Sequence, residues 1–318
     1  MMEQQPQGES RYNGPERRRA SRSVTPLSVP AITAPPGLQF PLEQKELTQV
    51  VRDALDEDNA FNDITTIATV LSTRRARCSM VARGAGVVCG VQLAIEAMRQ
   101  LDPKVAIRVD ADDGTRVEHG QPIMFLTGHA RGLLSAERVA VNFMMHLSGI
   151  ATLTCRYVDL VRGTGTKILD TRKTIPGLRK LAKYAVRCGG GHNHRMDLAA
   201  AVLIKDNHLA AVDGDVAVAI KRARDLAQPG TKIEIECDRI EQVKAALDAQ
   251  ADIILLDNMD THLMRECVEL AKGRAITEAS GGVNIDTVRG IAETGVDWIS
   301  IGKLTHSAPS LDMALDFD

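Results

Sequence analysis

The sequence predicts an α/β protein in which a parallel α/β barrel follows a smaller α+β domain. In the second half, short apolar runs recur, from the third onward about 20 residues or slightly more apart, with helical patterns between them. This alternation of strands and helices is typical of repeated βα units. Polar or small residues follow nearly every run, as they do at the active-site end of a barrel. An open doubly wound sheet also places a site at its strand ends, but a closed ring brings six strand ends together more naturally.

The composition excludes several classes of protein. The chain has 318 residues, is 44% hydrophobic and 25% charged, and carries a formal net charge of −2. This balance, with only 3% aromatic residues, argues against a nucleic-acid partner bound through bulk charge or base stacking. No apolar run approaches the roughly 20 residues that a membrane helix needs, and six scattered cysteines without a CxxC pair indicate free thiols. We therefore expect a cytoplasmic protein without a membrane or nucleic-acid partner.

Residues 1–38 differ in composition from the rest. Seven of the twelve prolines lie within the first 41 residues, together with five arginines among Gln, Ser and Gly. Such a stretch cannot bury enough apolar surface to offset its ordering entropy, so we predict a disordered Pro/Arg-rich tail. The acidic residues Glu3, Glu9 and Glu16 argue against a transit peptide.

The next segment, 39–147, predicts a small α+β domain. Residues 42–55 have the spacing of an amphipathic helix, and β-like runs follow at 76–82, 86–89 and 106–109, separated by Gly and Asp turns. A long helix is predicted after about Leu133, with Ser135 as its N-cap. Helical spacing then places three polar side chains together on one face: Arg138, Asn142 and His146.

Six β-like runs are predicted for the barrel, within 148–306. They span 167–170, 202–204, 232–236, 252–256, 274–277 and 298–301. The polar or small groups at their ends are Thr171 to Lys173, Lys205 to His208, Glu234 and Glu236, Asp257 with Asn258, Glu278 to Gly282, and Gly302 with Lys303. We expect these groups to face one pocket.

One stretch of the chain is strongly cationic. Between Lys167 and Lys205 there are nine Lys or Arg residues and only two acids, a net charge of +7 inside a protein of net −2. Four of the cations have the spacing of a solvent-exposed helix face, and we assign them to the surface: Arg179, Lys180, Lys183 and Arg187. Four others lie at strand ends or in a glycine-rich loop: Arg172, Lys173, Arg195 and Lys205. Cations that converge in this way favour a ligand with several carboxylates or phosphates.

Glycines mark two further features. Residues 189–191 are all Gly and lead into His192 and His194, but the ending of a P-loop is missing. A mobile loop that presents His194 and Arg195 to a ligand is the better interpretation, because two histidines without a third ligand are weak evidence of a metal. Residues 280–282, Ser-Gly-Gly, and later Gly302 offer backbone N–H groups at the usual phosphate site late in a barrel. Glycines that only form tight turns are the alternative.

Glu236 and Asp257 end neighbouring runs that are otherwise Ile and Leu. Two carboxylates at this position can bind a divalent cation, hydrogen-bond sugar hydroxyls or stabilise developing positive charge. Cations and carboxylates in one pocket suit a phosphorylated sugar with Mg²⁺. This reasoning predicts the class of ligand and leaves the reaction open.

Seven motifs resemble those of the quinolinate phosphoribosyltransferase family, also called nicotinate-nucleotide pyrophosphorylase (carboxylating), a type II phosphoribosyltransferase. They are LSAERVAVNFMMHLSGIAT, DTRKTIPGLRKLAKYAVRCGGGHNHRMDL, LIKDNH, IEIEC, ILLDN, EASGG and ISIGKLTHSAP. The resemblance runs from about Leu42 to the C-terminus. It implies an incomplete parallel α/β barrel of six to seven strands with an N-terminal α+β open sandwich, on which residues 307–318 are expected to pack.

The resemblance also implies the reaction. Quinolinate and 5-phosphoribosyl-1-pyrophosphate (PRPP) would form nicotinate mononucleotide, pyrophosphate and CO₂ in de novo NAD synthesis, with Mg²⁺ as cofactor. It implies a homodimer with shared active sites, and a higher oligomer stays open. The residues that would hold the quinolinate carboxylates are Arg172, Lys173, His194, Arg195, Lys205 and, from the neighbouring subunit, Arg138.

The remaining site residues would serve the sugar and the chemistry. By the resemblance, Glu236 and Asp257 lie near the ribose and the metal, which they would hold directly or through water or substrate. They would also stabilise oxocarbenium-like charge at the anomeric carbon. Four residues would supply the phosphate-binding backbone: Ser280, Gly281, Gly282 and Gly302. Lys205 is one candidate for the proton donor after decarboxylation, and water is the other.

Two rival functions stay open. One is a type II transferase for nicotinate or a related base, or the molybdenum-operon protein of the same fold. The double-carboxylate set of cations argues against a mono-acid substrate. The other is a non-catalytic sensor of phosphorylated sugars, which predicts lost acids at the strand ends, whereas Glu236 and Asp257 are both present.

Overall fold

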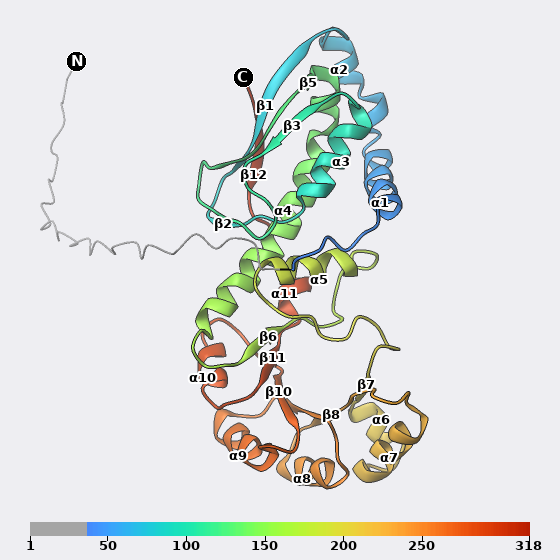
Figure 1. Ribbon diagram of the computed structural model, residues 1–318, viewed down its shortest axis with the longest axis vertical. Coiled ribbons are helices and arrows are strands. Elements are labelled where there is room, and N and C mark those ends of the chain that lie inside the picture. The colour runs from blue at the N-terminus through green and yellow to red at the C-terminus, as the bar shows by residue number, and fades with distance from the viewer. Residues whose placement is uncertain (1–36) are drawn as a thin grey trace, which may run out of the picture. The chain divides into compact units, whose positions relative to one another are not determined.

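The computed structural model describes residues 37–318, so the predicted tail at 1–38 lies outside the described residues except for its last two positions. The described part contains a four-stranded antiparallel sheet, a six-stranded parallel sheet and a small two-stranded sheet (Figure 1). The antiparallel sheet is formed mainly from the first half of the chain and the parallel sheet from the second half. The predicted α/β class with an α+β N-terminal part is therefore confirmed.

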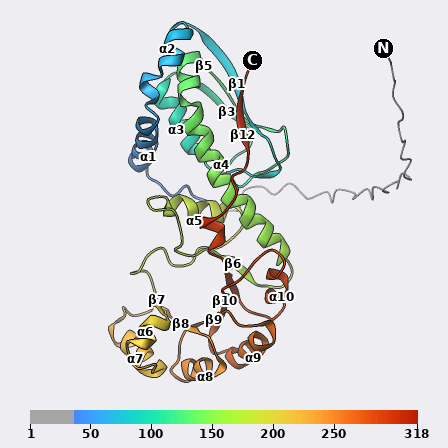
Figure 2. The ribbon, with the colours of Figure 1, turned by 180° about the vertical axis from the view of Figure 1, so that it is seen from behind.

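The antiparallel sheet has the strand order β12-β1-β5-β3. Its strands are β1 (Arg75–Ala82), β3 (Ala106–Val109), β5 (Pro122–His129) and β12 (Met313–Phe317). The last strand of the chain, β12, pairs antiparallel with β1, so the C-terminal residues lie at the edge of this sheet, as both views of the ribbon show (Figure 2). The small sheet pairs β2 (Gly86–Val87) with β4 (Arg116–Val117).

Helices cover this sheet because their apolar residues fall on one side. They are α1 (Gln44–Glu57), α2 (Ile64–Thr69) and α3 (Val91–Leu101), with a short 3₁₀ segment η1 (Ala60–Asn62) between the first two. In α1 the buried residues Leu47, Val51 and Leu55 recur every four positions, which is the apolar stripe of a surface helix. The predicted helix at 42–55 is thus present and shifted by two residues.

A single long helix, α4 (Ala130–Leu160), connects the two sheets. It begins directly after β5, with His129 at the N-cap position, so the prediction of Ser135 as N-cap is wrong. The chain makes no extended break at Ser135, whose hydroxyl instead donates to Asp63 Oδ2 at 3.0 Å. The helix is also the longest described, yet no helix among residues 37–318 is both long and apolar enough to span a bilayer.

The parallel sheet has the order β6-β11-β10-β9-β8-β7. Its strands are β6 (Lys167–Leu169), β7 (Val202–Ile204), β8 (Ile233–Cys237), β9 (Ile253–Asp257), β10 (Ile276–Ser280) and β11 (Trp298–Ser300). Strands β6 and β7 are the two edges, which makes the barrel incomplete, with six strands. Next to β6, His192 forms an isolated parallel bridge with Leu169 and extends that edge by one residue.

Helices cover the outer side of the parallel strands (Figure 1). They are α6 (Asp206–Ala210), α7 (Val216–Leu226), α8 (Ile240–Asp248), α9 (Thr261–Ala271) and α10 (Val288–Ala292). Two further helices, α5 (Arg179–Cys188) and α11 (Lys303–His306), pack against α4 and against each other. The strand predicted at 274–277 extends to Ser280, so Glu278 belongs to β10 and not to the loop after it. This extension places Ser280 beside Asp257 of β9 in the sheet register.

Candidate active site

Lys205 and Glu236 meet at the carboxyl end of the parallel sheet. Lys205 directly follows β7 and is the N-cap of α6, and Glu236 lies near the end of the neighbouring strand β8. The Lys205 Nζ atom lies 2.7 Å from Glu236 Oε2. The Lys205 side chain is nearly half exposed, so this ion pair faces solvent that a ligand can replace.

Asp257 and the glycines after β10 lie side by side at the same end. The N–H of Asn258 donates to the carbonyl of Ser280 at 2.9 Å, and the Asn258 amide donates to Asp257 Oδ2 at 2.8 Å. Gly281 has a φ of +89°, and a Cβ there would lie 2.2 Å from Asn258 Oδ1. Only glycine fits this position, and it leaves the backbone of the 281–282 turn uncovered.

The ends of β6 and β11 also converge. A Cβ placed on Gly302, just after β11, would lie 2.9 Å from Lys173 Cδ and 3.4 Å from the ring of His306. The Thr305 hydroxyl donates to the carbonyl of Lys173 at 2.8 Å. The Lys173 side chain therefore lies against Gly302. The His306 ring also lies next to Gly302, and His306 was not predicted as a site residue.

Arg172 and Arg195 form a pair of neighbouring cations. Burial and the nearby charge of Arg172 lower the pKa of Arg195. Arg195 donates from Nη1 to the carbonyl of Ala201 at 2.9 Å, while the buried Nε of Arg172 has no hydrogen-bond partner in the described part of the chain. Two cations that lie near one another favour an anion between them.

Lys183 lies in the interior, so its predicted place on an exposed helix face is wrong. Its side chain is 1% exposed and pairs with Asp170 at the end of β6. Its Nζ also donates to the carbonyl of His194 at 2.9 Å. The reason is that α5 is buried along almost its whole length, from Leu181 to Val186, so this turn of the helix faces the barrel. Lys180 and Arg187, in contrast, are exposed as predicted.

His194 lies two residues after the bridge between His192 and β6, and it lines a hollow together with Arg195 and Glu234. The Arg195 N–H donates to His194 Nδ1 at 2.8 Å, and His194 Nε2 lies 3.1 Å from Glu234 Oε2 and 3.5 Å from Glu278 Oε2. Burial alone lowers the pKa of His194, but the hydrogen bond to Glu234 and the charges of both glutamates outweigh it and raise the pKa to about 10. Burial raises the pKa of Glu234, because it disfavours the charged form of a carboxyl group. The three groups therefore share one proton more than three separate side chains would at neutral pH. Because Nδ1 accepts the Arg195 N–H, the ring keeps its proton on Nε2 and the additional proton lies on the carboxylates.

Glu234 and Glu278 were expected among the polar groups at the strand ends, but neither was assigned a role, and their contact with His194 was not predicted. A signal was present: in the IEIEC run the two acids alternate with Ile233, Ile235 and Cys237, and alternate residues of a strand face the same side. Glu236, near the strand end, was assigned to the acidic pair of the family together with Asp257. Glu234, two residues earlier, faces the same interior one layer deeper.

Arg138 lies apart from the other cations of this chain. It is exposed on α4 and lines a hollow of about 510 Å³ together with Asn142 and His146. The three polar side chains thus share one face of the helix, as predicted. Acidic residues near the end of α1, Asp53 and Glu57, line the same hollow.

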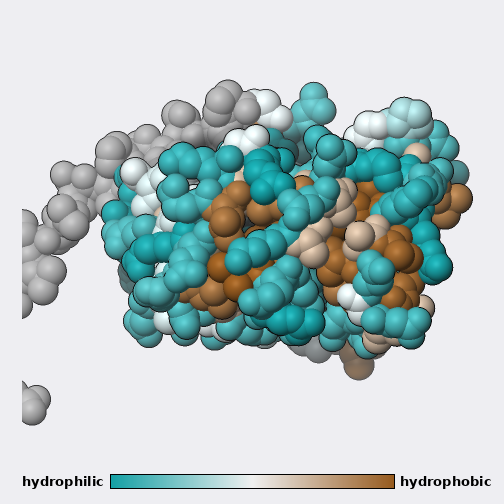
Figure 3. All heavy atoms as spheres, turned by 90° about the horizontal axis from the view of Figure 1, so that it is seen from below, coloured by the Kyte–Doolittle hydropathy of each residue, from teal (hydrophilic) through white to brown (hydrophobic). Residues whose placement is uncertain are grey.

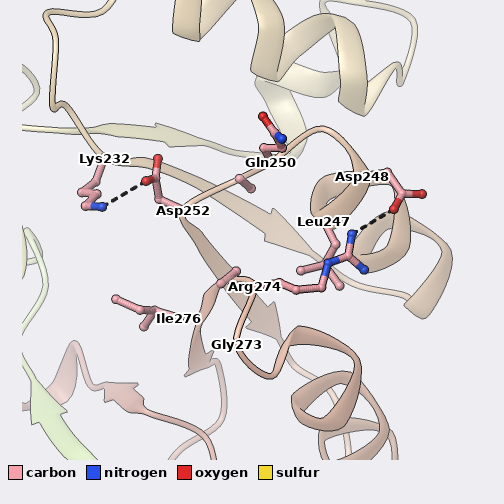
Figure 4. Close-up of a pocket in the computed structure, with 10 residues that line it drawn as sticks. Lys232, Leu247, Asp248, Gln250, Asp252, Gly273, Arg274 and Ile276 are labelled. Carbon is pink, nitrogen blue, oxygen red and sulfur yellow. Dashed lines mark hydrogen bonds and ion pairs between the residues drawn. The ribbon is translucent and has the colours of Figure 1, made fainter.

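A larger hollow, of about 720 Å³, lies at the opposite ends of β9 and β10 (Figure 4). Its charges are paired within the protein: Lys232 Nζ lies 3.1 Å from Asp252 Oδ1, and Arg274 Nη2 lies 3.0 Å from Asp248 Oδ1. A hollow with matched charges at the amino ends of the strands is not the place for a barrel active site.

The fold and the site together define a class of protein. Cations follow β6 and β7, carboxylates end β8 and β9, and glycine-rich backbone follows β10 and β11, all at the carboxyl ends of parallel strands. This arrangement is typical of an α/β-barrel enzyme that brings an anionic substrate to a phosphorylated one.

Comparison with known proteins identifies the family. The family model for the N-terminal domain of quinolinate phosphoribosyl transferase matches residues 63–148, and that for its C-terminal domain matches residues 150–316. The nicotinate-nucleotide pyrophosphorylase (carboxylating) of Mycobacterium leprae is 46% identical over 272 residues, which are 84% of this chain and 95% of that protein. A probable nicotinate-nucleotide pyrophosphorylase (carboxylating) of Bacillus subtilis is 39% identical over 85% of this chain and 93% of its own length. The chain belongs to the quinolinate phosphoribosyltransferase family, so the resemblance seen in the sequence is confirmed.

The fold agrees with solved structures of such enzymes. The nicotinate-nucleotide pyrophosphorylase of Francisella tularensis matches with a TM-score of 0.82 and 37% identity, over 88% of this chain and 99% of that chain. The corresponding protein of Ehrlichia chaffeensis matches with a TM-score of 0.82 and 40% identity, over 87% of this chain and 99% of that one.

Proposed function

We propose that this chain joins quinolinate to PRPP and releases pyrophosphate and CO₂, which makes it a pentosyltransferase of NAD biosynthesis. The observation that supports this proposal most directly is the ion pair of Lys205 with Glu236 at the carboxyl ends of the strands. Arg172 and Arg195 lie close enough to one another for the charge of Arg172 to lower the pKa of Arg195. The family model and the names of relatives that match nearly end to end support the same reaction.

Quinolinate is a dianion with carboxylates on adjacent ring carbons, and the cations of this site suit it. Arg172 and Arg195 can each hold a carboxylate through two parallel hydrogen bonds. Lys173 and Lys205 add point charges from the ends of β6 and β7. Arg172 and Arg195 repel one another in the free protein. A bound dianion would reduce this electrostatic repulsion, which favours its binding.

The phosphate groups of PRPP are assigned to backbone. Gly281 and Gly282 have φ values of +89° and +62°, and Gly302 lies against Lys173. In such turns successive N–H groups can point at one anion. Ser280 adds a hydroxyl, and Lys173 a charge, at the same end of the sheet.

The residues present fit a magnesium ion that is shared with the substrate. Glu236 and Asp257 lie on neighbouring strands, and each has one carboxylate oxygen engaged by Lys205 or Asn258. Mg²⁺ is commonly held by one or two carboxylates together with water and substrate phosphates, so these two acids would hold it with PRPP. The ion would neutralise charge on the departing pyrophosphate.

The transfer step breaks the bond from the anomeric carbon to pyrophosphate and forms a bond to the ring nitrogen of quinolinate. Positive charge develops on the ribose, and Glu236 and Asp257 are placed to stabilise it electrostatically. Lys205, which neutralises Glu236 in the free protein, would turn to a quinolinate carboxylate and release the acid for this task.

Decarboxylation follows because the quaternised ring nitrogen withdraws electrons. The bond to the adjacent carboxylate breaks, its electron pair stays on the ring carbon, and CO₂ leaves. That carbon then takes a proton. Lys205 Nζ is the proton donor that the site offers, and water is the alternative.

The complete site would be shared between two subunits. Arg138 is exposed on α4 and lies in a different hollow from Arg172 and Lys205, so it would reach the site of the neighbouring chain. Exposed apolar side chains support a partner surface: Ile64, Ile67, Leu71, Leu198 and Leu226. Apolar areas also interrupt the hydrophilic surface on the face seen from below (Figure 3). We propose a homodimer, with a higher oligomer as an alternative.

We also propose a cytoplasmic location. All six cysteines are free, and five of them are buried, as suits a reducing compartment. Among relatives, the rice protein carries the label chloroplastic and a tobacco protein the label mitochondrial.

Substrate choice tests the proposed function. The purified chain is incubated with PRPP, Mg²⁺ and either quinolinate or nicotinate, and nicotinate mononucleotide is measured. We expect product from quinolinate and at most trace product from nicotinate. Equal turnover of both acids, or no turnover by a folded dimer, would contradict the proposal.

A further inference from the structure

Every polar group of His194 is engaged by the protein. Its main-chain N–H donates to Asp170 Oδ1 at 2.9 Å, and its carbonyl accepts from Lys183 Nζ at 2.9 Å. Its ring accepts at Nδ1 from the Arg195 N–H at 2.8 Å and faces Glu234 Oε2 with Nε2 at 3.1 Å. The ring is therefore fixed between the interior of the barrel and the backbone of Arg195.

The two glutamates on the inner side of the ring are buried without a full set of partners. Glu234 is 2% exposed and Glu278 is 0% exposed. Glu234 Oε1 and both oxygens of Glu278 have no hydrogen-bond partner in the described part of the chain. Burying a carboxylate in this way costs stability. A barrel layer built only for packing would carry Val, Ile or Leu, as Ile253 and Leu255 do on the strand between them.

We infer that Glu234 and Glu278 are positioning residues for the anion pocket. They hold the His194 ring from inside the barrel, and the ring holds the Arg195 backbone, which keeps the Arg195 guanidinium beside Arg172 for a substrate carboxylate. This inference rests on the proposed function. It adds two residues that touch neither substrate and act through His194.

The geometry distinguishes this role from that of a metal site. The donor atoms of His194, Glu234 and Glu278 lie within 4.8 Å of one another, a set that can hold a transition metal. His194 Nδ1, however, accepts the Arg195 N–H, so the ring proton is on Nε2, the atom that faces the carboxylates. A protonated nitrogen cannot bind a metal, whereas it donates well to a carboxylate.

Three variants test the inference by comparing the two substrates. Glu234→Leu removes the acceptor of Nε2–H, and Glu234→Gln restores an uncharged acceptor of the same shape. Glu96→Gln is the control, since Glu96 is also a largely buried carboxylate, at 9% exposure, but accepts from Thr48 and Gln100 in the N-terminal part. For Glu234→Leu we expect KM for quinolinate to rise about 10- to 100-fold, the loss of one charge-assisted hydrogen bond. KM for PRPP and kcat should change about threefold or less, and Glu234→Gln should recover most of the lost affinity.

Other outcomes would overturn the inference. An unchanged KM for quinolinate in Glu234→Leu, an equal rise of KM for both substrates, or a Gln variant as impaired as the Leu variant would each do so. Turnover by the unaltered chain is measured alongside, because its absence would contradict the proposed function and not the role of the glutamates.

A second measurement reads the protonation of the unaltered protein directly. Nitrogen-15 NMR of the histidine rings, with the His194 signal assigned by a His194→Gln variant, reports which ring nitrogen carries the proton. We expect the proton on Nε2 and no stoichiometric transition metal by elemental analysis. A proton confined to Nδ1, or one tightly bound metal ion that a Glu278→Gln variant loses, would overturn the inference.

Discussion

Lys205 Nζ lies 2.7 Å from Glu236 Oε2, across the neighbouring strands β7 and β8. The Lys205 side chain is 46% exposed and that of Glu236 15%, and an ion pair so open to water contributes little to folding stability. Its position at the strand ends fits a pair that separates when the two substrates bind. The cation would then meet a quinolinate carboxylate and the acid the ribose.

We predict that Lys205→Ala lowers kcat/KM for quinolinate about 100-fold or more, since it removes both a substrate cation and the candidate proton donor. The melting temperature should change by only a few degrees, because the pair is exposed. Lys221→Ala is the matched control: its exposed partner Asp225 lies 2.5 Å away on α7, far along the chain from the strand ends. Wild-type turnover by Lys205→Ala would remove this residue from the mechanism.

Lys183→Met should lower the free energy of unfolding. Lys183 is the buried partner of Asp170, and removing one member of a buried ion pair typically costs about 3–5 kcal/mol because the other charge is left unpaired. Chemical denaturation measures the loss. The exposed neighbour Lys180, which pairs with Glu46 at 2.6 Å, provides the control, and Lys180→Met should change the unfolding free energy by less than about 1 kcal/mol. Equal effects of the two variants would contradict the burial of Lys183.

Gly281→Ala should weaken PRPP binding. The new methyl group would lie 2.2 Å from Asn258 Oδ1, so Asn258 must move and the turn at 281–282 with it. Gly273→Ala has a comparable φ of +72° but nothing within 4 Å of the new methyl group. Both variants carry the backbone strain of about 1 kcal/mol, but only Gly281→Ala should raise KM for PRPP. A rise in both would point to loss of stability instead.

Mixing of variants tests the shared site. Arg138→Ala and Lys205→Ala should each be inactive alone. In a heterodimer of the two, one site combines an intact Lys205 with an intact Arg138 from the other chain. Random exchange makes half of the dimers heterodimers, so about a quarter of wild-type activity should return. Native mass spectrometry verifies exchange, and exchange without recovered activity would rule out a role for Arg138 in trans.

Much of the fold is predictable from the sequence, because the local patterns of helix and strand and the regular spacing of the strands indicate the same architecture. Five of the six predicted barrel strands lie within about two residues of their observed bounds, since short β-like runs that recur between helical patterns favour parallel strands. The run at 274–277 was cut short because Glu278 and Ser280 are polar, although both lie inside β10. An inward-facing polar residue of a barrel strand looks like a loop residue in the sequence.

Site residues were predictable from the sequence only where a charged or polar side chain follows or ends a predicted strand. Lys205 and Glu236 were identified in this way, and the structure brings them into contact. Lys183 was misplaced because helical spacing shows which residues share a face but not which face meets the barrel, and its partner Asp170 is 13 positions away. His194 and Glu278 are 84 positions apart in the numbering, so only the folded sheet shows their contact.

In the proposed reaction, transfer to quinolinate is coupled to loss of the carboxylate beside the ring nitrogen. Quinolinate labelled in that carboxyl group, incubated with PRPP and Mg²⁺, tests this coupling. We expect one labelled CO₂ for each nicotinate mononucleotide, and no CO₂ when PRPP is omitted. Nucleotide formed with the label retained, or CO₂ released without PRPP, would contradict it.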